Sequence, residues 1–352
     1  MNRRFALIQA AISLVALAAV VLWATGQDPP EFPSGNDALA WLAGALALYA
    51  VATLIRGERW HRILEISGVK AGRADCYALT TVGYMGNNVL PARAGEVLRV
   101  VMLSPRCGAS KRTVGGSIVA ERLLDVVALA VIFLATVYGV LSASALPTTH
   151  PRLMAVIIVA IVLALAGVIW ILRSHHVFER VRDWLRPLAD SPRALLSRAG
   201  AVLLVVTFVL WSVEAGVYLA VARSVDLDIG MSGALYLVAL TNFVSALPAA
   251  PGSIGTFDAA VAWGVERLAR GSGKAVSYLL ILRFILYVPI TLVGFVVLVT
   301  RYGGWSRLRD ALRAAKTAEE VESEVLTGKP APHGRGSHQT APAPSRAEAP
   351  TA

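Results

Sequence analysis

The sequence predicts an all-α polytopic membrane protein, and three observations lead to that prediction. The 352 residues are 56% hydrophobic, with a mean hydropathy of +0.62. Only 16% of the residues are charged, whereas a soluble protein carries about 25%. The charges gather between apolar runs of roughly 20 residues, the length at which a helix crosses a bilayer. We therefore expect a membrane domain over residues 1–304.

Six apolar runs predict full membrane spans. They cover approximately residues 5–23, 38–55, 115–141, 153–172, 199–221 and 275–300. At about 1.5 Å of rise per residue, such runs cross the hydrocarbon core as helices. The first run exceeds the apolar core of a signal peptide, so we expect it to be a retained span.

Two further apolar segments are interrupted by helix-breaking residues. The first covers about residues 75–104 and the second about 234–268; the expected breaks are Pro91 and Gly95 in the first, and Pro248, Pro251, Gly252 and Gly255 in the second. Two complete spans need roughly 40 residues, so each segment predicts a re-entrant helical hairpin. Non-helical backbone at such depth is tolerated only where protein or water covers it. Six spans and two hairpins result, or eight transmembrane segments if each hairpin counts once.

The positions of the basic residues predict the orientation. They concentrate in residues 1–4, 56–73, 106–112 and 173–198 and after residue 300, and basic loops stay in the cytoplasm. We expect a multi-pass protein of the plasma (cytoplasmic) membrane with both termini cytoplasmic. The net charge of +10 is then a topological signal, and no nucleic-acid partner is expected.

Three cytoplasmic segments are predicted from their composition. Residues 56–73 place Trp60, Ile63 and Leu64 at helical spacing among arginines, which favours a short amphipathic surface helix over a plain basic loop. Residues 305–328 predict a second surface helix. Residues 329–352 are rich in Pro, Ala, Gly and Ser with no apolar run, so we expect a disordered tail.

The two broken segments share a motif. Leu90-Pro91-Ala92-x-x-Gly95 recurs 157 residues later as Leu247-Pro248-Ala249-x-x-Gly252, and Arg122 and Arg283 are 161 residues apart. Each half of the chain has the order span, span, broken hairpin, span, with opposite direction. This pattern predicts an inverted repeat, about 1–145 and 151–304, with a site near the midplane.

The first hairpin tip carries groups suited to an anion. Free backbone N–H groups at Gly95 and Glu96, together with Arg93, would suit a phosphate. The alternative is an Arg93–Glu96 ion pair that closes the hairpin. Arg99 lies one turn after Glu96, and Asn88 precedes the break.

A second charged cluster lies early in the 115–141 span. Glu121 and Asp125 are four residues apart and share a helix face, and Arg122 can pair with Asp125. The alternative is a cluster that reaches to water and only marks the helix end.

The second half contains its own intramembrane polar residues. Asn242 precedes the second break and Asp258 follows it, while Arg283 and Tyr287 lie one turn apart in the last span. Glu214 lies in the middle of a span, where we expect it to pair with Arg283 or to bind a proton. Glu214 and Asp258 are therefore candidates for proton coupling, and a buried structural ion pair is the alternative.

No pattern points to a metal, a cofactor or catalysis. The two cysteines and the single adjacent histidine pair lack the spacing of metal ligands, and no nucleotide-binding or hydrolase motif is present. We expect no metal, no cofactor and no enzyme activity.

These motifs resemble the membrane domain of lysylphosphatidylglycerol synthases, a family of flippase-like integral membrane proteins. The pattern N-x-L-P-x-R-x-G-E-x-x-R begins at Asn88, E-R-x-x-D begins at Glu121, and L-P-x-x-P-G-x-x-G-x-x-E/D begins at Leu247. The resemblance covers about residues 5–302 and implies movement of a lipid between leaflets. Because only about fifty residues follow Arg301, we expect no lipid-synthesising domain in this chain.

The resulting hypothesis is a flippase-like transporter for an anionic phospholipid or a polyprenyl-phosphate-linked lipid. The expected headgroup site comprises Asn88, Arg93, Glu96, Arg99, Glu121, Arg122, Asp125, Asn242, Asp258, Arg283 and Tyr287. The alternative is a membrane scaffold or subunit that presents lipid to a cytoplasmic transferase in cell-envelope lipid or glycan synthesis. The expected partners are membrane lipids and, in the alternative, that transferase. A membrane-embedded transferase has the weakest support.

Overall fold

The computed structural model describes residues 3–27, 29–30, 32–90, 93–139, 195–245, 250–269 and 273–304. All of them lie in the first of the two units of the chain, Met1–Leu308. The expected span at 153–172, most of the basic loop at 173–198, the surface helix at 305–328 and the tail lie outside the described residues. So do Pro91, Pro248 and most of the repeated Leu-Pro-Ala motifs. Every regular element in the described ranges is a helix, which confirms the all-α class.

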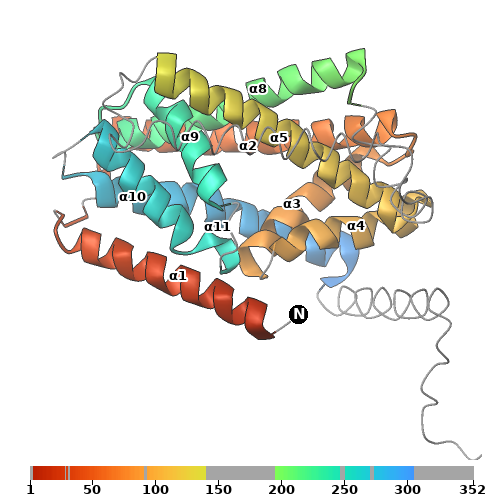
Figure 1. The fold of residues 1–352 in the computed structure, drawn as a ribbon, viewed down its shortest axis with the longest axis horizontal. Coiled ribbons are helices and arrows are strands. Elements are labelled where there is room, and N and C mark those ends of the chain that lie inside the picture. Colours follow the sequence, from red (N-terminus) through yellow and green to blue (C-terminus); the bar gives the residue numbers. More distant parts are fainter. Residues whose placement is uncertain are drawn as a thin grey trace, which may run out of the picture. The chain divides into compact units, whose positions relative to one another are not determined.

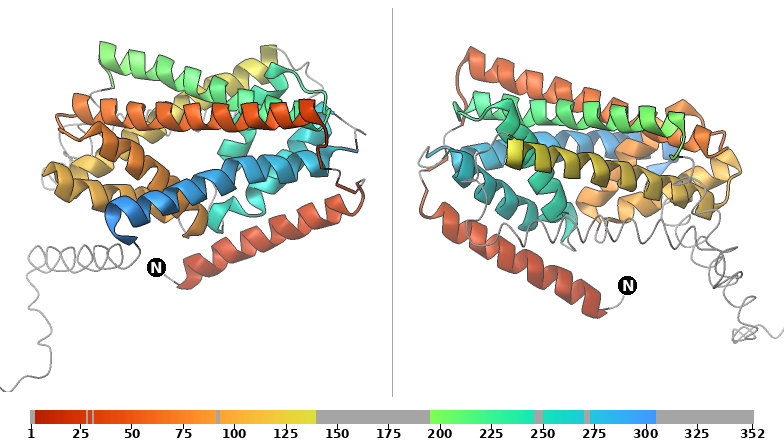
Figure 2. Two further views of the ribbon diagram at one scale, coloured as in Figure 1. Left: turned by 180° about the vertical axis from the view of Figure 1, so that it is seen from behind. Right: turned by 45° about the horizontal axis from the view of Figure 1, so that its top comes forward.

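Five long helices form the frame of the described part (Figures 1 and 2). They are α1 (Arg3–Ala24), α2 (Asn36–Ile66), α5 (Lys111–Gly139), α8 (Arg198–Ser224) and α11 (Ala275–Tyr302). Among the described residues, α2, α8 and α11 are long and apolar enough to cross a membrane, as predicted for 38–55, 199–221 and 275–300. Helices α1 and α5 coincide with the expected spans at 5–23 and 115–141.

Two interrupted helix pairs occupy the places of the predicted hairpins. The first consists of α3 (Arg73–Val89) and α4 (Ala94–Cys107), and the second of α9 (Met231–Ser245), the short 3₁₀ helix η3 (Pro251–Ser253) and α10 (Thr256–Leu268). In each pair the two α-helices pack against each other. Figures 1 and 2 show the pairs near opposite ends of α11. Both interruptions therefore lie at the expected places in the chain, although Gly95 falls within α4 rather than in the break.

Helix α2 differs from its prediction. It continues without interruption to Ile66, and Arg56, Arg59 and Trp60 on its last turns are buried. The expected surface helix over 56–73 is therefore wrong, and so is the plain basic loop. The physical reason is that α5 and α8 pack on this part of α2 and bring carboxylates to its arginines.

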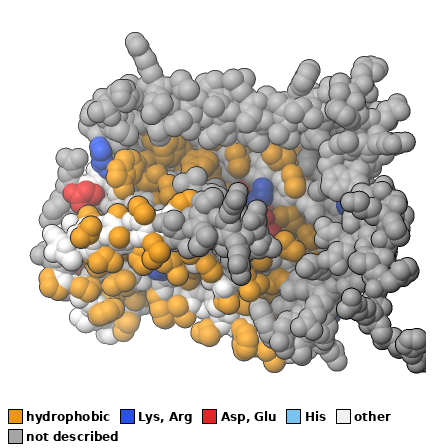
Figure 3. Space-filling view, turned by 60° about the horizontal axis from the view of Figure 1, so that its bottom comes forward, with side chains coloured by type: hydrophobic (Ala, Val, Ile, Leu, Met, Phe, Trp, Pro, Cys, Tyr) orange, Lys and Arg blue, Asp and Glu red, His pale blue; other side chains and the backbone are white. Residues whose placement is uncertain are grey.

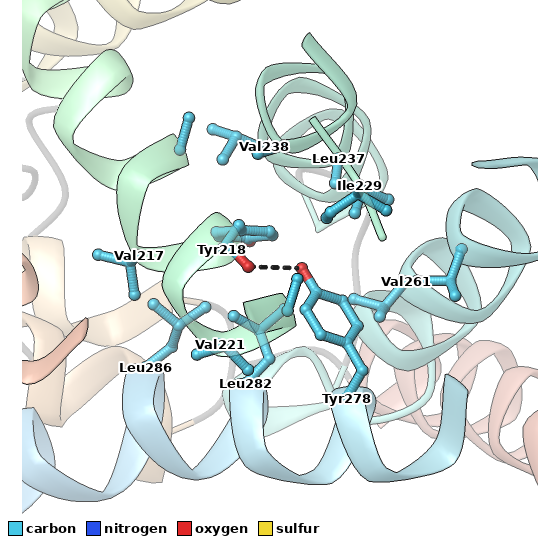
Figure 4. Packing of buried hydrophobic residues seen from close by; sticks show 14 of the residues in the cluster. Val217, Tyr218, Val221, Ile229, Leu237, Val238, Val261, Tyr278, Leu282 and Leu286 are labelled. Carbon is cyan, nitrogen blue, oxygen red and sulfur yellow. Dashed lines mark hydrogen bonds between the residues drawn. The ribbon is translucent and has the colours of Figure 1, made fainter. Parts of the chain in front are cut away.

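Apolar packing holds the second helix pair against the frame. The large buried cluster joins residues of α8, α9, α10 and α11, among them Val221, Leu237, Val261 and Leu282 (Figure 4). The Tyr278 hydroxyl donates to the backbone oxygen of residue 218 on α8 at 3.4 Å. The outside is apolar as well: Figure 3 shows mainly hydrophobic side chains on the described surface of one face. Such a surface is suited to lipid rather than to water.

Glycines permit the close approach of α3 and α4. A Cβ atom on Gly95 would collide with the backbone oxygen of Gly83, and one on Gly86 would come within 2.8 Å of the Gly95 Cα. Small residues serve the same purpose in other membrane helix pairs. Gly95 thus lies in the first turn of α4 rather than in the break itself. Arg93, which occupies the N-cap position of α4, adopts a left-handed backbone conformation with φ of 53°.

We expect Gly95→Ala to destabilise the protein by about 1–3 kcal/mol, because the added methyl group overfills a packed contact. The measurement is the apparent melting temperature of the purified protein in detergent. Gly44→Ala on α2 is the matched control, since a Cβ there meets nothing within 4 Å and alanine favours the helix. Equal melting temperatures for both variants would contradict the close contact between α3 and α4.

Candidate functional site

A buried ion network joins α2 to α5. Arg59 of α2 is 1% exposed and Glu121 of α5 is fully buried. The Arg59 guanidinium donates to Asp125 at 2.6 Å and to Glu121 at 3.4 Å, and also to the Thr207 hydroxyl of α8 at 3.1 Å. Glu121 and Asp125 therefore share a face, as predicted, but they face the protein interior. The alternative of a cluster that reaches to water at the helix end is wrong for these two carboxylates.

The same carboxylates bind the first helix pair. Arg99 of α4 donates to Glu121 at 2.6 Å and lies 4.0 Å from the ring centre of Trp60. Arg122 contacts Glu121 at 3.1 Å and Asp125 at 3.4 Å, the second contact being the predicted pair. Because Glu121 neutralises arginines from three helices, its carboxylate ties α2, α4 and α5 together.

A polar cavity of about 150 Å³ lies beside this network. Side chains and backbone of the two helix pairs and of α2, α5, α8 and α11 surround it. Its lining includes Tyr49, Arg56, Tyr84, Asn87, Asn88, Arg93, Glu96, Arg122, Trp211, Glu214, Tyr218, Thr241, Asn242, Ser245, Gly252, Ser253, Phe257, Leu286 and Tyr287. This volume is below the roughly 300–1,000 Å³ of pockets that enclose a drug-sized ligand. It suits part of a molecule, such as a headgroup.

The tips of the two helix pairs meet at the cavity. Arg93 at the start of α4 donates to the backbone oxygen of Ser245 at the end of α9, at 3.0 Å. The Asn88 amide at the end of α3 donates to the Thr291 hydroxyl of α11 at 2.9 Å. A Cβ on Gly252 of η3 would lie 3.4 Å from the backbone oxygen of Asn88. Residues 152, 164 and 203 positions apart in the sequence are thereby neighbours.

Arg93 and Glu96 do not pair with each other. Glu96 instead lies 3.6 Å from Arg122. Arg93 has no ion pair among the described residues, and its side chain is exposed. The alternative of an Arg93–Glu96 pair that closes the hairpin is therefore wrong. Arg93 keeps an uncompensated positive charge at the cavity.

Arg56 and Glu214 form an ion pair across the cavity wall, between α2 and α8. The Arg56 guanidinium also lies 5.3 Å from the ring centre of Tyr84 and 5.6 Å from that of Trp211. The expected pairing of Glu214 with Arg283 is thus wrong. Arg56 was missed because it sits at the end of an apolar run, where arginine ordinarily marks the membrane surface.

Arg283 organises the second tip instead. It donates to the backbone oxygen of Gly252 at 3.2 Å and lies 3.3 Å from an Asp258 carboxylate oxygen. Asp258 in turn accepts a hydrogen bond from the Gly255 N–H at 2.8 Å and caps α10. The Arg283 guanidinium also lies 4.6 Å from the Tyr287 ring centre. Asp258 and Arg283 therefore shape the tip without lining the cavity.

The structure divides the predicted headgroup residues into two groups. The cavity is lined by Asn88, Arg93, Glu96, Arg122, Asn242 and Tyr287, together with the proton-coupling candidate Glu214. The remaining predicted residues, Arg99, Glu121, Asp125, Asp258 and Arg283, are ion-paired behind it. Sequence reasoning missed Arg56, Arg59, Asn87 and most of the aromatic lining. The sequence does contain a signal for Arg56 and Arg59. Each carboxylate inside the membrane needs a cation nearby, and Glu214 and Asp125 pair with these two arginines.

The described residues contain no group of three or more His, Cys, Asp or Glu side chains placed to hold a metal ion. The cavity offers guanidinium groups, amides, hydroxyls and aromatic rings, and its two carboxylates, Glu96 and Glu214, are each paired with an arginine. This combination is suited to an anionic group that carries hydroxyls.

The apolar helices and the interior polar cavity define a helical membrane protein with a buried polar site. The chain belongs to the family described as the lysylphosphatidylglycerol synthase TM region, which matches residues 7–294. The resemblance predicted from the motifs is thus confirmed.

Two relatives are similar over most of the chain. Glycosyltransferase AglD of Haloferax volcanii is 23% identical over 334 residues, which covers 80% of this chain and 52% of that protein. A UPF0104 membrane protein of Methanothermobacter thermautotrophicus is 23% identical over 275 residues, or 70% of this chain and 81% of that protein. The chain thus spans about half the length of the first relative. No solved structure matches.

We expect Glu121→Gln to destabilise the protein strongly, because Arg99 would lose its carboxylate partner among the described residues and Arg59 would keep only Asp125. Breaking a buried ion pair by removing one partner costs about 3–5 kcal/mol. The measurement is the midpoint of unfolding in mixed detergent with increasing dodecyl sulfate. Asp228→Asn is the control, since that carboxylate is 94% exposed in its pair with Arg223, and exposed pairs contribute little. An unchanged midpoint for Glu121→Gln would show that the network is not needed for the fold.

Proposed function

We propose that this protein moves a phosphate-bearing anionic lipid between the two leaflets of a membrane, without enzyme activity of its own. The main observation behind this proposal is the polar cavity where the two interrupted helix pairs meet. Arg93 lines this cavity and has no ion pair among the described residues. The apolar outer surface supports this function, because a headgroup can occupy the cavity while the acyl or prenyl chains stay in the hydrocarbon core. Membership of the family supports it as well.

The phosphate binds at the start of α4 in this proposal. In the described part of the chain no side chain caps this helix, and the N–H groups at the start of a helix can donate to an anion. Arg93 stands at the same end and supplies the charge, and Arg122 stands on the neighbouring α5. Asn88 and Asn242 donate to or accept from the rest of the headgroup.

The proposed transport uses an inverted repeat with alternating access. The first helix pair enters from the cytoplasm and the second from outside, each as a re-entrant hairpin, so that their tips meet near the midplane. Their positions near opposite ends of α11 and the contact between Arg93 and Ser245 support this arrangement. Glu214 is the candidate for proton coupling, because protonation would release Arg56 toward the headgroup. Asp258 is already engaged at the second tip.

The alternative is a membrane subunit that presents lipid to a cytoplasmic transferase in cell-envelope synthesis. It is favoured by one observation, namely that a relative twice as long is named a glycosyltransferase and matches 80% of this chain. It predicts stable co-purification with such an enzyme and no lipid movement by the protein alone.

We expect the purified full-length protein to accelerate the movement of phosphatidylglycerol labelled on its acyl chain across liposomes. Dithionite quenching of the label in the outer leaflet measures the rate. Arg93→Gln should lower the rate at least tenfold, because loss of a charged hydrogen bond to phosphate costs about 1.5–3 kcal/mol. Arg223→Gln, whose side chain is 45% exposed at the end of α8, is the control and should retain the rate. Rates equal to those of empty liposomes for every phosphate-bearing lipid would refute transport and favour the alternative.

We also expect both chain termini to face the cytoplasm in the plasma membrane. In a background with Cys76→Ser and Cys107→Ser, a membrane-impermeant maleimide should label Ser34→Cys on intact cells. It should label Ser110→Cys, between α4 and α5, only after permeabilisation. Both positions are exposed, so permeabilised cells serve as the control for reactivity. The opposite labelling pattern would reverse the proposed orientation.

A further inference from the structure

We infer that the headgroup carries one net negative charge, on a phosphodiester, and that the rest of it is uncharged and hydroxyl-bearing. This inference rests on the proposed function, and it specifies the substrate class of the same cavity. Three properties of the cavity lead to this inference. They are the balance between arginines and carboxylates, the guanidinium groups that lie near its aromatic rings, and the buried polar atoms without a described hydrogen-bond partner.

The charge balance leaves one positive charge for a ligand. The two carboxylates at the cavity are both paired, Glu96 with Arg122 and Glu214 with Arg56. Behind the wall, Glu121 and Asp125 together compensate Arg59 and Arg99 and contact Arg122, and Asp258 compensates Arg283. In the described part of this network, six arginines thus face five carboxylates, and Arg93 is the arginine without an ion pair.

A singly charged phosphodiester restores neutrality at this position. An uncompensated charge within the membrane region costs free energy, and the ligand removes that cost. A phosphomonoester carries about 1.5–2 negative charges at neutral pH and would leave an excess of negative charge. A diphosphate would leave more. The cavity therefore favours lipids in which the phosphate is esterified on both sides.

The cavity disfavours a cationic headgroup. An ammonium group binds best to a free carboxylate or over the face of an aromatic ring, and four of the six aromatic residues that line the cavity already have a guanidinium group nearby. Both cavity carboxylates are already paired. Arg56 lies near the rings of Tyr84 and Trp211, at 5.3 and 5.6 Å, and Arg283 lies near those of Phe257 and Tyr287, at 5.5 and 4.6 Å. An aminoacylated lipid would bring its ammonium next to guanidinium groups.

The unpartnered polar atoms favour hydroxyl groups. The Asn87 Oδ1, the Trp211 Nε1 and the Ser245 Oγ are buried, belong to residues that line the cavity, and have no hydrogen-bond partner among the described residues. The first can only accept a hydrogen bond and the second can only donate one, whereas a hydroxyl does both. A glycerol or a sugar supplies such groups, and an ammonium does not.

The test compares lipids of different headgroup charge in the same proteoliposome assay and by native mass spectrometry of lipid retained on the full-length protein. The lipids are phosphatidylglycerol, a sugar-phosphate polyprenol, phosphatidic acid and lysylphosphatidylglycerol. We expect phosphatidylglycerol or the sugar phosphodiester to exceed the other two at least tenfold in rate or retention. Whichever of the two is favoured identifies the hydroxylated group as glycerol or sugar.

A charge variant makes the test specific. Glu96→Gln adds one uncompensated positive charge at the cavity, while Arg122 keeps Glu121 and Asp125. This variant should shift the preference toward phosphatidic acid, and Arg93→Gln should remove the preference for anionic lipids. Lys70→Gln, on the segment between α2 and α3, is the control and should leave the order of preference unchanged.

The results separate this inference from the proposed function. Transport or retention of lysylphosphatidylglycerol equal to that of phosphatidylglycerol overturns the inference and leaves transport standing. Selective retention of the phosphodiesters without movement of any lipid supports the inference and refutes transport. An unaltered preference in Glu96→Gln contradicts the charge balance on which the inference stands.

Discussion

A guanidinium group among apolar helices needs a carboxylate within reach, and Arg59 shows how this need shapes the structure. It is almost completely buried on α2 and meets Asp125 at 2.6 Å. Its other neighbour, Glu121, also holds Arg99 of the first helix pair. Helix α2 can extend into the protein only because α5 supplies these two carboxylates. The position of α4, and with it the start of the cavity, depends on the same pair of side chains.

The cavity lies beside Arg93, the arginine of this network that has no carboxylate partner among the described residues. Ion pairs surround it on several sides, yet Arg93 has no ion pair in the described ranges and donates to a backbone oxygen across the junction of the two tips. Buried ion pairs contribute little net stability, because desolvation offsets their attraction, so their main effect here is on geometry. Because these ion pairs engage the other arginines around the cavity, the Arg93 guanidinium is the cation that remains without a carboxylate partner in the described residues. The fold thus places a set of paired charges around Arg93, the guanidinium group that the proposed headgroup would neutralise.

The sequence allowed much of this to be predicted. Apolar run length gave α1, α2, α5, α8 and α11, and the proline and glycine motifs gave the breaks between the paired helices. The meeting of the two tips at one polar site was expected from the motif that the two broken segments share. Arg56 and Arg59 did not follow, because an arginine near the end of an apolar run has the same appearance whether it faces water or a carboxylate on another helix. The distinction is a tertiary one, made by α5 and α8.

The partner of Glu214 was unpredictable for a similar reason. Arg283 was the expected partner because it lies within another span, whereas the packing of α2 on α8 brings Arg56 to Glu214. Asp258 illustrates the converse. It lies three residues after Gly255, which is the spacing of a helix-capping carboxylate. Its hydrogen bond to the Gly255 N–H could therefore be predicted from the neighbouring sequence alone.

The first helix has a consequence for the order of assembly. The Ser13 hydroxyl of α1 accepts a hydrogen bond from the Ala250 N–H at 2.7 Å, and a Cβ on Gly255 would collide with the α1 backbone. These contacts join positions 237 residues apart. At about 5–20 residues per second of synthesis, α1 waits on the order of 10–50 s before its partner exists. Helix α1 is therefore made long before the segment it packs against, and the second tip can close on it only after Ala250 and Gly255 have been synthesised.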